Sequence, residues 1–90
     1  MYKLLKFYKV DCCPCELLDS TLQIIQQKCN INIEHIDNSY IFEGSIGYRM
    51  NVYDSPTLIL VKDDTEVFRV KGYVSEEELT NLLLPYIDWR

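Results

Sequence analysis

The chain has 90 residues, of which 48% are hydrophobic and 26% charged, and its formal net charge is −5. This length predicts one small domain, residues 1–90, with a single modest core. The negative charge argues against nucleic acid and anionic lipid as partners. No apolar run is long enough to cross a membrane, and the first residues lack the apolar region and cleavage site of a signal peptide. We therefore expect a cytoplasmic protein.

The first third of the chain predicts a strand, a helix and a second strand. Residues 2–10 are bulky and largely apolar, which is typical of a strand covered on both faces. Residues 13–28 carry apolar side chains at helical spacing. Residues 31–36 alternate between apolar and polar side chains and predict the second strand.

The middle of the chain is expected to be less regular. Residues 37–39 predict a turn that caps a weaker helix over residues 40–50, because Gly44 and Gly47 lower its helical propensity. The helical connections after the first and second strands are long enough for right-handed crossovers between parallel strands.

The last third predicts a hairpin and a helix. Residues 57–62 form the clearest strand, and a turn at residues 63–64 leads into an antiparallel partner over residues 66–71. Gly72 ends that strand. Ser75 and Glu78 form a capping box for a final helix, which Pro85 kinks or ends. The expected buried stripe of this helix consists of Leu79, Leu82, Leu83 and Tyr86.

The predicted order is therefore β-α-β-α-β-β-α. It indicates an α/β fold with a four-stranded mixed sheet flanked by three helices, which cover both faces. The end of the first strand is where open α/β sheets place their functional sites.

Cys12 and Cys15 form a C-x-x-C pair at that position, between the first strand and the first helix. This layout is typical of a dithiol redox centre. Unpaired N–H groups and the helix dipole favour a thiolate there, and such sites lower a cysteine pKa from about 8.5 to roughly 3.5–7.5. Pro14 suits a first helical turn. Three of the four cysteines fall within four residues, which favours redox or metal chemistry over stapling of the fold.

With the order of elements and the tripeptide Ser55-Pro56-Thr57, the motif Cys12-Cys13-Pro14-Cys15 resembles the thioredoxin superfamily over nearly the whole chain. The resemblance implies a thioredoxin-like fold, a redox-active disulfide between Cys12 and Cys15, and a cis peptide bond before Pro56. It implies that Cys12 attacks a substrate disulfide and that Cys15, less exposed, resolves the mixed disulfide. No cofactor or metal is expected.

The chain also departs from thioredoxins. It lacks their extra first strand and helix, so its size is closer to that of a glutaredoxin. Asp11 stands where thioredoxins usually have Trp, and Cys13 replaces Gly. Lys6 falls where they keep a buried acid. If Lys6 points toward Cys15, its charge would favour that thiolate. The alternative, which we prefer, is that its stem packs while its amine reaches water.

The resemblance also suggests a substrate-binding surface. The backbone of Ser55, beside Pro56, would pair with an extended substrate segment. Tyr53, Tyr73 and Val74 would rim a shallow apolar groove around Cys12, although the tyrosines could equally be ordinary surface residues.

The remaining candidate residues are open to more than one interpretation. Cys13 is a tolerated substitution or an alternative resolving thiol. Cys29 is interpreted as a small, partly buried hydrophobe. His35 is interpreted as a strand residue and not a catalytic base, since nothing in the sequence places it near Cys12. A zinc site from Cys12, Cys15 and these two is not expected, because the fold separates them.

We therefore expect a small monomeric thiol–disulfide oxidoreductase that reduces protein disulfides, with a reductase or glutathione as electron donor. One alternative is a glutathione-dependent glutaredoxin, in which Lys9 and the stretch of residues 72–76 would bind glutathione. Another is a non-catalytic binding module or an iron–sulfur carrier.

Overall fold

The computed structural model describes residues 1–87 and contains four strands and three helices. Their order matches the prediction from the sequence. Along the chain they are β1 (Tyr2–Tyr8), α1 (Cys13–Lys28), β2 (Asn32–Asp37), α2 (Ile46–Arg49), β3 (Thr57–Lys62), β4 (Thr65–Lys71) and α3 (Glu76–Leu83).

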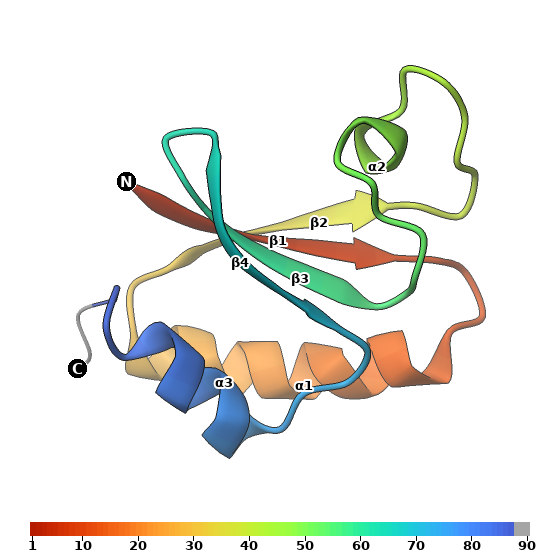
Figure 1. Ribbon diagram of the computed structural model, residues 1–90. Coiled ribbons are helices and arrows are strands. Elements are labelled where there is room, and N and C mark those ends of the chain that lie inside the picture. Colours follow the sequence, from red (N-terminus) through yellow and green to blue (C-terminus); the bar gives the residue numbers. More distant parts are fainter. Residues whose placement is uncertain (88–90) are drawn as a thin grey trace.

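The four strands form one mixed sheet in the order β2-β1-β3-β4. Strands β1 and β2 are parallel, whereas β3 is antiparallel to both β1 and β4. Helices α1 and α3 pack on one face of the sheet, and α2 lies on the other side (Figure 1). This confirms the predicted four-stranded mixed sheet with helices on both faces.

The predicted parallel crossover after the second strand is wrong, because β3 runs antiparallel to β1. The physical reason is the length of α2. Its four residues rise only about 6 Å, whereas a six-residue strand is about 20 Å long. The chain therefore stays at one end of the sheet after β2 and enters β3 from there (Figure 1).

Side-chain alternation along the two central strands creates a core on each face of the sheet. Leu4 of β1 and Leu58 of β3 pack toward α1 and α3, while Leu5 and Ile59 face the opposite side. The core on the helical side is the larger one, and it includes Leu18, Leu22, Ile25, Leu79 and Leu83. Lys6 has the same parity as Leu4, so its side chain also lies on the side of α1.

Several element boundaries differ from the prediction. Strand β1 ends at Tyr8 and not at residue 10, and Val10 is exposed. The predicted helix over residues 40–50 shrinks to α2, since Gly44 adopts a positive φ of 93° that stops a helix from forming earlier. Ser45 caps α2, because its hydroxyl accepts the Tyr48 N–H at 3.3 Å.

The C-terminal elements follow the prediction closely. Asp63 and Asp64 both have positive φ angles, as the tight hairpin turn requires. Ser75 accepts the Glu78 N–H at 3.2 Å, which confirms the N-terminal cap of α3. That helix ends at Leu83, before Pro85.

Two members of the predicted buried stripe of α3 are not buried in that helix. Leu82 lies in α3 but is partly exposed. Tyr86 follows the helix, and its ring centre lies 5.7 Å from that of Tyr2 in a tilted arrangement. Within residues 1–87, no helix has the length and apolar character needed to span a lipid bilayer.

Candidate redox site

Cys12 and Cys15 form a disulfide at the N-terminus of α1. Their Cα atoms are 5.2 Å apart, and Cys12 occupies the N-cap position of the helix. The Cys15 N–H donates to Cys12 Sγ at 3.2 Å, and the Glu16 N–H donates to the Cys12 carbonyl at 3.2 Å. Pro14 lies in the first turn, as predicted. The first sulfur therefore lies where backbone N–H groups and the helix dipole favour negative charge.

Both disulfide cysteines are more enclosed than the sequence suggested. Cys12 is 5% exposed and Cys15 is 3% exposed, so the expected difference between an open and a shielded sulfur is very small in the oxidised protein. Both line a surface recess, through which a substrate would have to approach them. Cys13, by contrast, is exposed and lies outside the disulfide.

The loop before the motif is fastened to the loop after β2. The Val10 N–H donates to Ser39 Oγ at 3.0 Å, and the Ser39 hydroxyl donates to Asp37 Oδ1 at 2.6 Å. The Ser39 backbone N–H also donates to Asp37 Oδ1, at 2.9 Å, and the two hydrogen bonds from Ser39 hold the pKa of the Asp37 carboxyl below its ordinary value. Asp11 adopts a positive φ of 56°, which Asp tolerates better than most residues. These contacts thus fix the conformation of the loop that joins β1 to α1.

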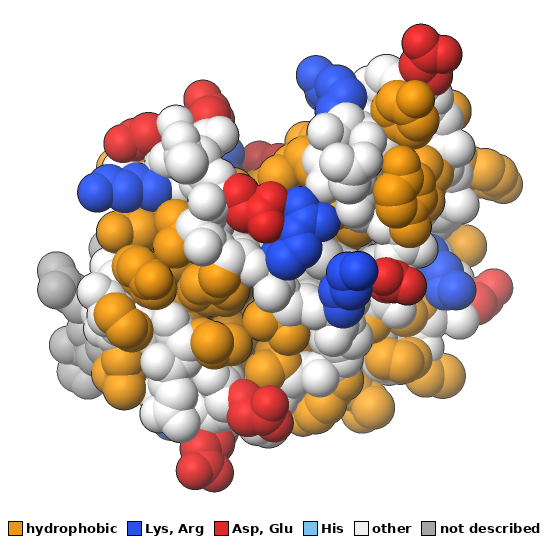
Figure 2. Space-filling view, in the orientation of Figure 1, with side chains coloured by type: hydrophobic (Ala, Val, Ile, Leu, Met, Phe, Trp, Pro, Cys, Tyr) orange, Lys and Arg blue, Asp and Glu red, His pale blue; other side chains and the backbone are white. Residues whose placement is uncertain are grey.

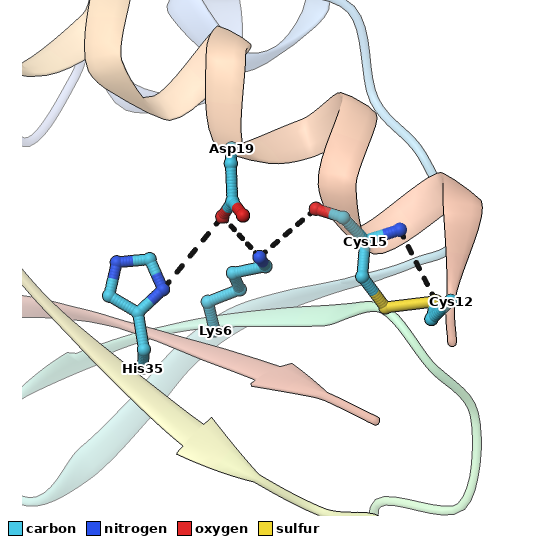
Figure 3. A network of polar contacts seen from close by, with 5 residues as sticks. All are labelled: Lys6, Cys12, Cys15, Asp19 and His35. Carbon is cyan, nitrogen blue, oxygen red and sulfur yellow. Dashed lines mark hydrogen bonds and ion pairs between the residues drawn. A yellow bond between two sulfur atoms is a disulfide. The ribbon is translucent and has the colours of Figure 1, made fainter. Parts of the chain in front are cut away.

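A polar network lies beside the disulfide, and the sequence predicted only part of it. Lys6 is 2% exposed, and its Nζ donates to the Cys15 carbonyl at 3.0 Å. Lys6 also forms an ion pair with Asp19 of α1, and His35 Nδ1 of β2 lies 3.9 Å from Asp19 Oδ1 (Figure 3). The preferred interpretation of Lys6, with its amine in water, is wrong because the amine is enclosed between β1 and α1.

Sequence reasoning missed Asp19. It placed His35 correctly on a strand, β2, but not near Cys12, whereas the two residues line the same recess. Two signals could have found them. Asp19 follows Cys15 by four residues, so the two share a face of α1. His35 is the direct partner of Lys6 in the parallel pairing of β1 with β2.

The Ser55–Pro56 peptide bond is cis, as the resemblance implied. The segment is held on both sides, since the Gly72 N–H donates to the Pro56 carbonyl at 2.7 Å and Thr57 Oγ1 donates to the Asp54 carbonyl at 2.6 Å. A second recess lies here, and Lys9 lines both this recess and the one beside the disulfide. The two recesses therefore share Lys9.

The predicted rim of the groove is only partly present. Tyr53 and Tyr73 are exposed, as a binding surface requires. Val74 is 2% exposed and belongs to the core on the helical side of the sheet, so its side chain is not available as an apolar rim.

Other apolar side chains are exposed near the same end of the sheet. Figure 2 shows hydrophobic side chains gathered over α2 and the loop before it, at the upper right of the view. Tyr40, Phe42 and Tyr48 are among the exposed apolar residues of this region. The sequence did not single them out.

The part of the chain that the structure describes brings no three His, Cys, Asp or Glu side chains together in a way that could hold a metal ion. Cys29 is buried at the far end of α1, where its thiol donates to the Ile25 carbonyl at 3.2 Å.

Comparison with known proteins agrees with this geometry. The sequence profile of the thioredoxin family matches residues 2–84. A mutant thioredoxin from Halobacterium salinarum is 25% identical and superposes with a TM-score of 0.85, over 97% of this chain and 75% of that one. A thioredoxin from Nicotiana alata is 21% identical with a TM-score of 0.80, over 97% and 74% of the two chains. A malarial protein is 23% identical with a TM-score of 0.82, over 96% and 97%. A search of curated proteins finds no significant match.

A cysteine pair at the start of the helix that follows the first strand, with a cis-proline before β3, defines a thioredoxin-fold protein with a dithiol–disulfide site. The chain belongs to the thioredoxin family. Its fold and its cysteine pair support a general thiol–disulfide oxidoreductase role.

Proposed function

We propose that this protein reduces disulfides in other proteins through the Cys12–Cys15 dithiol. The observation that carries the proposal is the position of Cys12 as N-cap of α1, where its sulfur accepts the Cys15 N–H. A sulfur that is a hydrogen-bond acceptor at a helix N-terminus is stabilised as a thiolate, which is the nucleophile in disulfide exchange.

The proposed reaction has two exchange steps. The Cys12 thiolate attacks one sulfur of the substrate disulfide, and the other substrate sulfur leaves as a thiolate that takes up a proton. The Cys15 thiolate then attacks Cys12 Sγ, which breaks the mixed disulfide and releases the second substrate thiol. Two electrons pass to the substrate, and the protein is left with the Cys12–Cys15 disulfide seen in the structure.

An electron donor must then reduce this disulfide. We propose a reductase as donor, and that the protein works as a monomer in the cytoplasm. Substrates would approach past Tyr53, Ser55, Pro56 and Tyr73, of which Tyr53 and Ser55 line the recess that shares Lys9 with the disulfide.

A glutathione-dependent reaction is the second candidate, and the position of Lys9 favours it. This lysine lines both recesses, so its ammonium could hold a glutathione carboxylate close to Cys12. The two candidates differ in the use of Cys15, because a monothiol reaction with glutathione needs only the attacking cysteine.

Turnover of a model disulfide such as insulin separates these functions. Each reducing system, thioredoxin reductase with NADPH or glutathione with glutathione reductase, is supplied to the wild type, Cys12→Ser and Cys15→Ser. We expect wild-type turnover with the thioredoxin system, loss of turnover in both variants, and covalent adducts with Cys15→Ser. Turnover by Cys15→Ser with glutathione alone would favour the second candidate. A wild type that is inactive in both systems would contradict an enzymatic function and favour a binding module or, if a visible chromophore is present after anaerobic purification, an iron–sulfur carrier.

A further inference from the structure

The Lys6 ammonium is buried in the core, where loss of hydration makes a charge unfavourable. The residue is 2% exposed, on a central strand, and it shares the helical face of β1 with the fully buried Leu4. An apolar side chain of similar length would fill the same space without the loss of hydration that an ammonium suffers. Its retention in the core therefore calls for a role that an apolar residue could not perform.

The position of the ammonium points to Cys15. Lys6 Nζ donates to the carbonyl oxygen of Cys15 (Figure 3). The ammonium therefore contacts the backbone of the residue that carries the second sulfur. Asp19 lies one turn further along α1 and holds the ammonium in place through an ion pair. The network thus fixes the ammonium close to the cysteine that resolves the mixed disulfide.

The two charges of the ion pair do not cancel at Cys15. The Lys6 side chain is almost fully enclosed, whereas that of Asp19 is 45% exposed and in contact with water. Water screens the field of an exposed carboxylate much more than that of a buried ammonium. The net field at Cys15 therefore favours negative charge.

We propose that Lys6 is a positioning residue that stabilises the Cys15 thiolate in the reduced protein and thereby speeds the resolution of the mixed disulfide. This inference rests on the proposed function. In the resolving step the Cys15 thiol loses its proton to water in the recess, and its thiolate forms the bond to Cys12 Sγ. The bond between Cys12 and the substrate sulfur breaks, and the departing thiolate takes up a proton.

Other titratable groups line the same recess, and their charges also affect how the ionisation of Cys15 depends on pH. They come from β1, the loop after it, α1 and β2, and they are Tyr8, Lys9, Asp11, Glu16 and His35. The Lys6 ammonium also lies 5.6 Å from the centre of the Tyr8 ring, which adds a favourable contact for the cation.

The test compares Lys6→Met with Lys3→Met. Met keeps the length of the stem, and the Asp19 carboxylate left behind can be hydrated. Lys3 is the matched control, because it lies on the same strand, its side chain is 41% exposed, and it pairs with Glu34 at 3.4 Å. In the reduced proteins, the chemical shift of the Cys15 Cβ carbon is followed against pH by NMR. We expect Lys6→Met to raise the pH at which Cys15 ionises by about one unit or more, and Lys3→Met to leave it unchanged.

A kinetic readout follows the same variants. A single turnover with a model disulfide is quenched in acid, and the mixed disulfide is quantified by mass spectrometry. Near neutral pH we expect the mixed disulfide of Lys6→Met to persist about tenfold longer than that of the wild type, in line with a shift of about one pH unit. Equal ionisation of Cys15 in a folded Lys6→Met and in the wild type would overturn the proposal.

The wild type offers a test that needs no substitution. Because the coupling between two charges is reciprocal, a thiolate at Cys15 must make Lys6 harder to deprotonate. We expect Lys6 to lose its proton at a higher pH in the reduced protein than in the oxidised one, measured at its Cε carbon. The same titration in both states would overturn the proposal. Neither NMR readout depends on turnover, so failure of the proposed function and failure of this inference are distinguishable.

Discussion

Gly47 lies against the buried side chain of Asn38, and the two residues fit together only because glycine has no Cβ. A Cβ placed at residue 47 would lie 1.9 Å from Asn38 Oδ1 and 2.7 Å from its Cγ. Asn38 cannot easily turn away, since its side-chain amide donates to the Val52 carbonyl at 3.1 Å. This contact holds α2 close to the end of β2.

Gly47→Ala should therefore destabilise the fold. The added methyl group must displace Asn38 or the backbone of α2, and overpacking of this kind costs about 1–3 kcal/mol. Urea unfolding followed by circular dichroism measures the loss of unfolding free energy.

The control is a double-mutant cycle with Asn38→Ala, which removes the atoms that the new Cβ would meet. In that background we expect Gly47→Ala to cost much less than it does alone. Additive effects of the two substitutions would show that the clash with Asn38 is not the cause.

At the scale of elements, Arg69 ties β4 to the end of α2. Its Nη2 donates to the Met50 carbonyl at 2.8 Å and its Nη1 to the Asn51 carbonyl at 3.2 Å. Glu66 orients the guanidinium through two further hydrogen bonds, at 2.6 and 2.7 Å. The hydrogen bonds that Arg69 donates to Glu66 hold the pKa of the Glu66 carboxyl below its ordinary value and raise the pKa of the Arg69 guanidinium. Arg69, oriented by Glu66 of the same strand, thus fastens the end of the short helix to the sheet.

This arrangement predicts how stability depends on pH. Because the pKa of Glu66 is lower in the folded than in the unfolded state, its contribution is present above the ordinary Glu pKa of 4.5 and is lost as the pH falls through the folded-state value. We expect Glu66→Gln to be less stable than the wild type by about 0.5–1 kcal/mol near neutral pH. In acid, below the folded-state pKa, the difference should vanish.

Urea unfolding at a series of pH values measures this difference. Glu43→Gln is the matched control, since Glu43 lies in the exposed loop before α2. A Glu66→Gln variant whose deficit does not change with pH would contradict the assigned role of the ion pair.

The sequence predicted those elements whose signals are local. Strand β3, the turn at Asp63 and Asp64, and the cap at Ser75 depend on neighbouring residues, and the structure has them where expected. The extent of α2 was overestimated, since its apolar positions could not reveal the positive φ of Gly44.

The surroundings of Lys6 could not be predicted by the same means. They depend on the parallel pairing of β1 with β2 and on the packing of α1 across both strands, which brings Asp19 and His35 together from residues far apart in the chain.

At the scale of the whole molecule, the candidate site combines parts from across the sheet. The disulfide comes from the start of α1, the buried lysine from β1, the histidine from β2 and the cis-proline from the segment before β3. Strands β1 and β2 finish at the same end of the sheet, and β3 begins there (Figure 1). The fold therefore brings these parts to one end of the sheet, and Cys12 lies at the N-terminus of α1, where the helix dipole favours negative charge.

The rate of alkylation of each cysteine in the reduced protein tests this account most directly. Cys12 is largely enclosed, whereas Cys13, its immediate neighbour, is exposed and serves as an internal control. The protein is treated with limiting iodoacetamide over a range of pH, and peptide mass mapping identifies the cysteine that reacts first. We predict that Cys12 reacts ahead of Cys13 and is already reactive well below the ordinary thiol pKa of about 8.5. A Cys13 that reacts first at every pH, with Cys12 no faster than an ordinary thiol, would contradict the account.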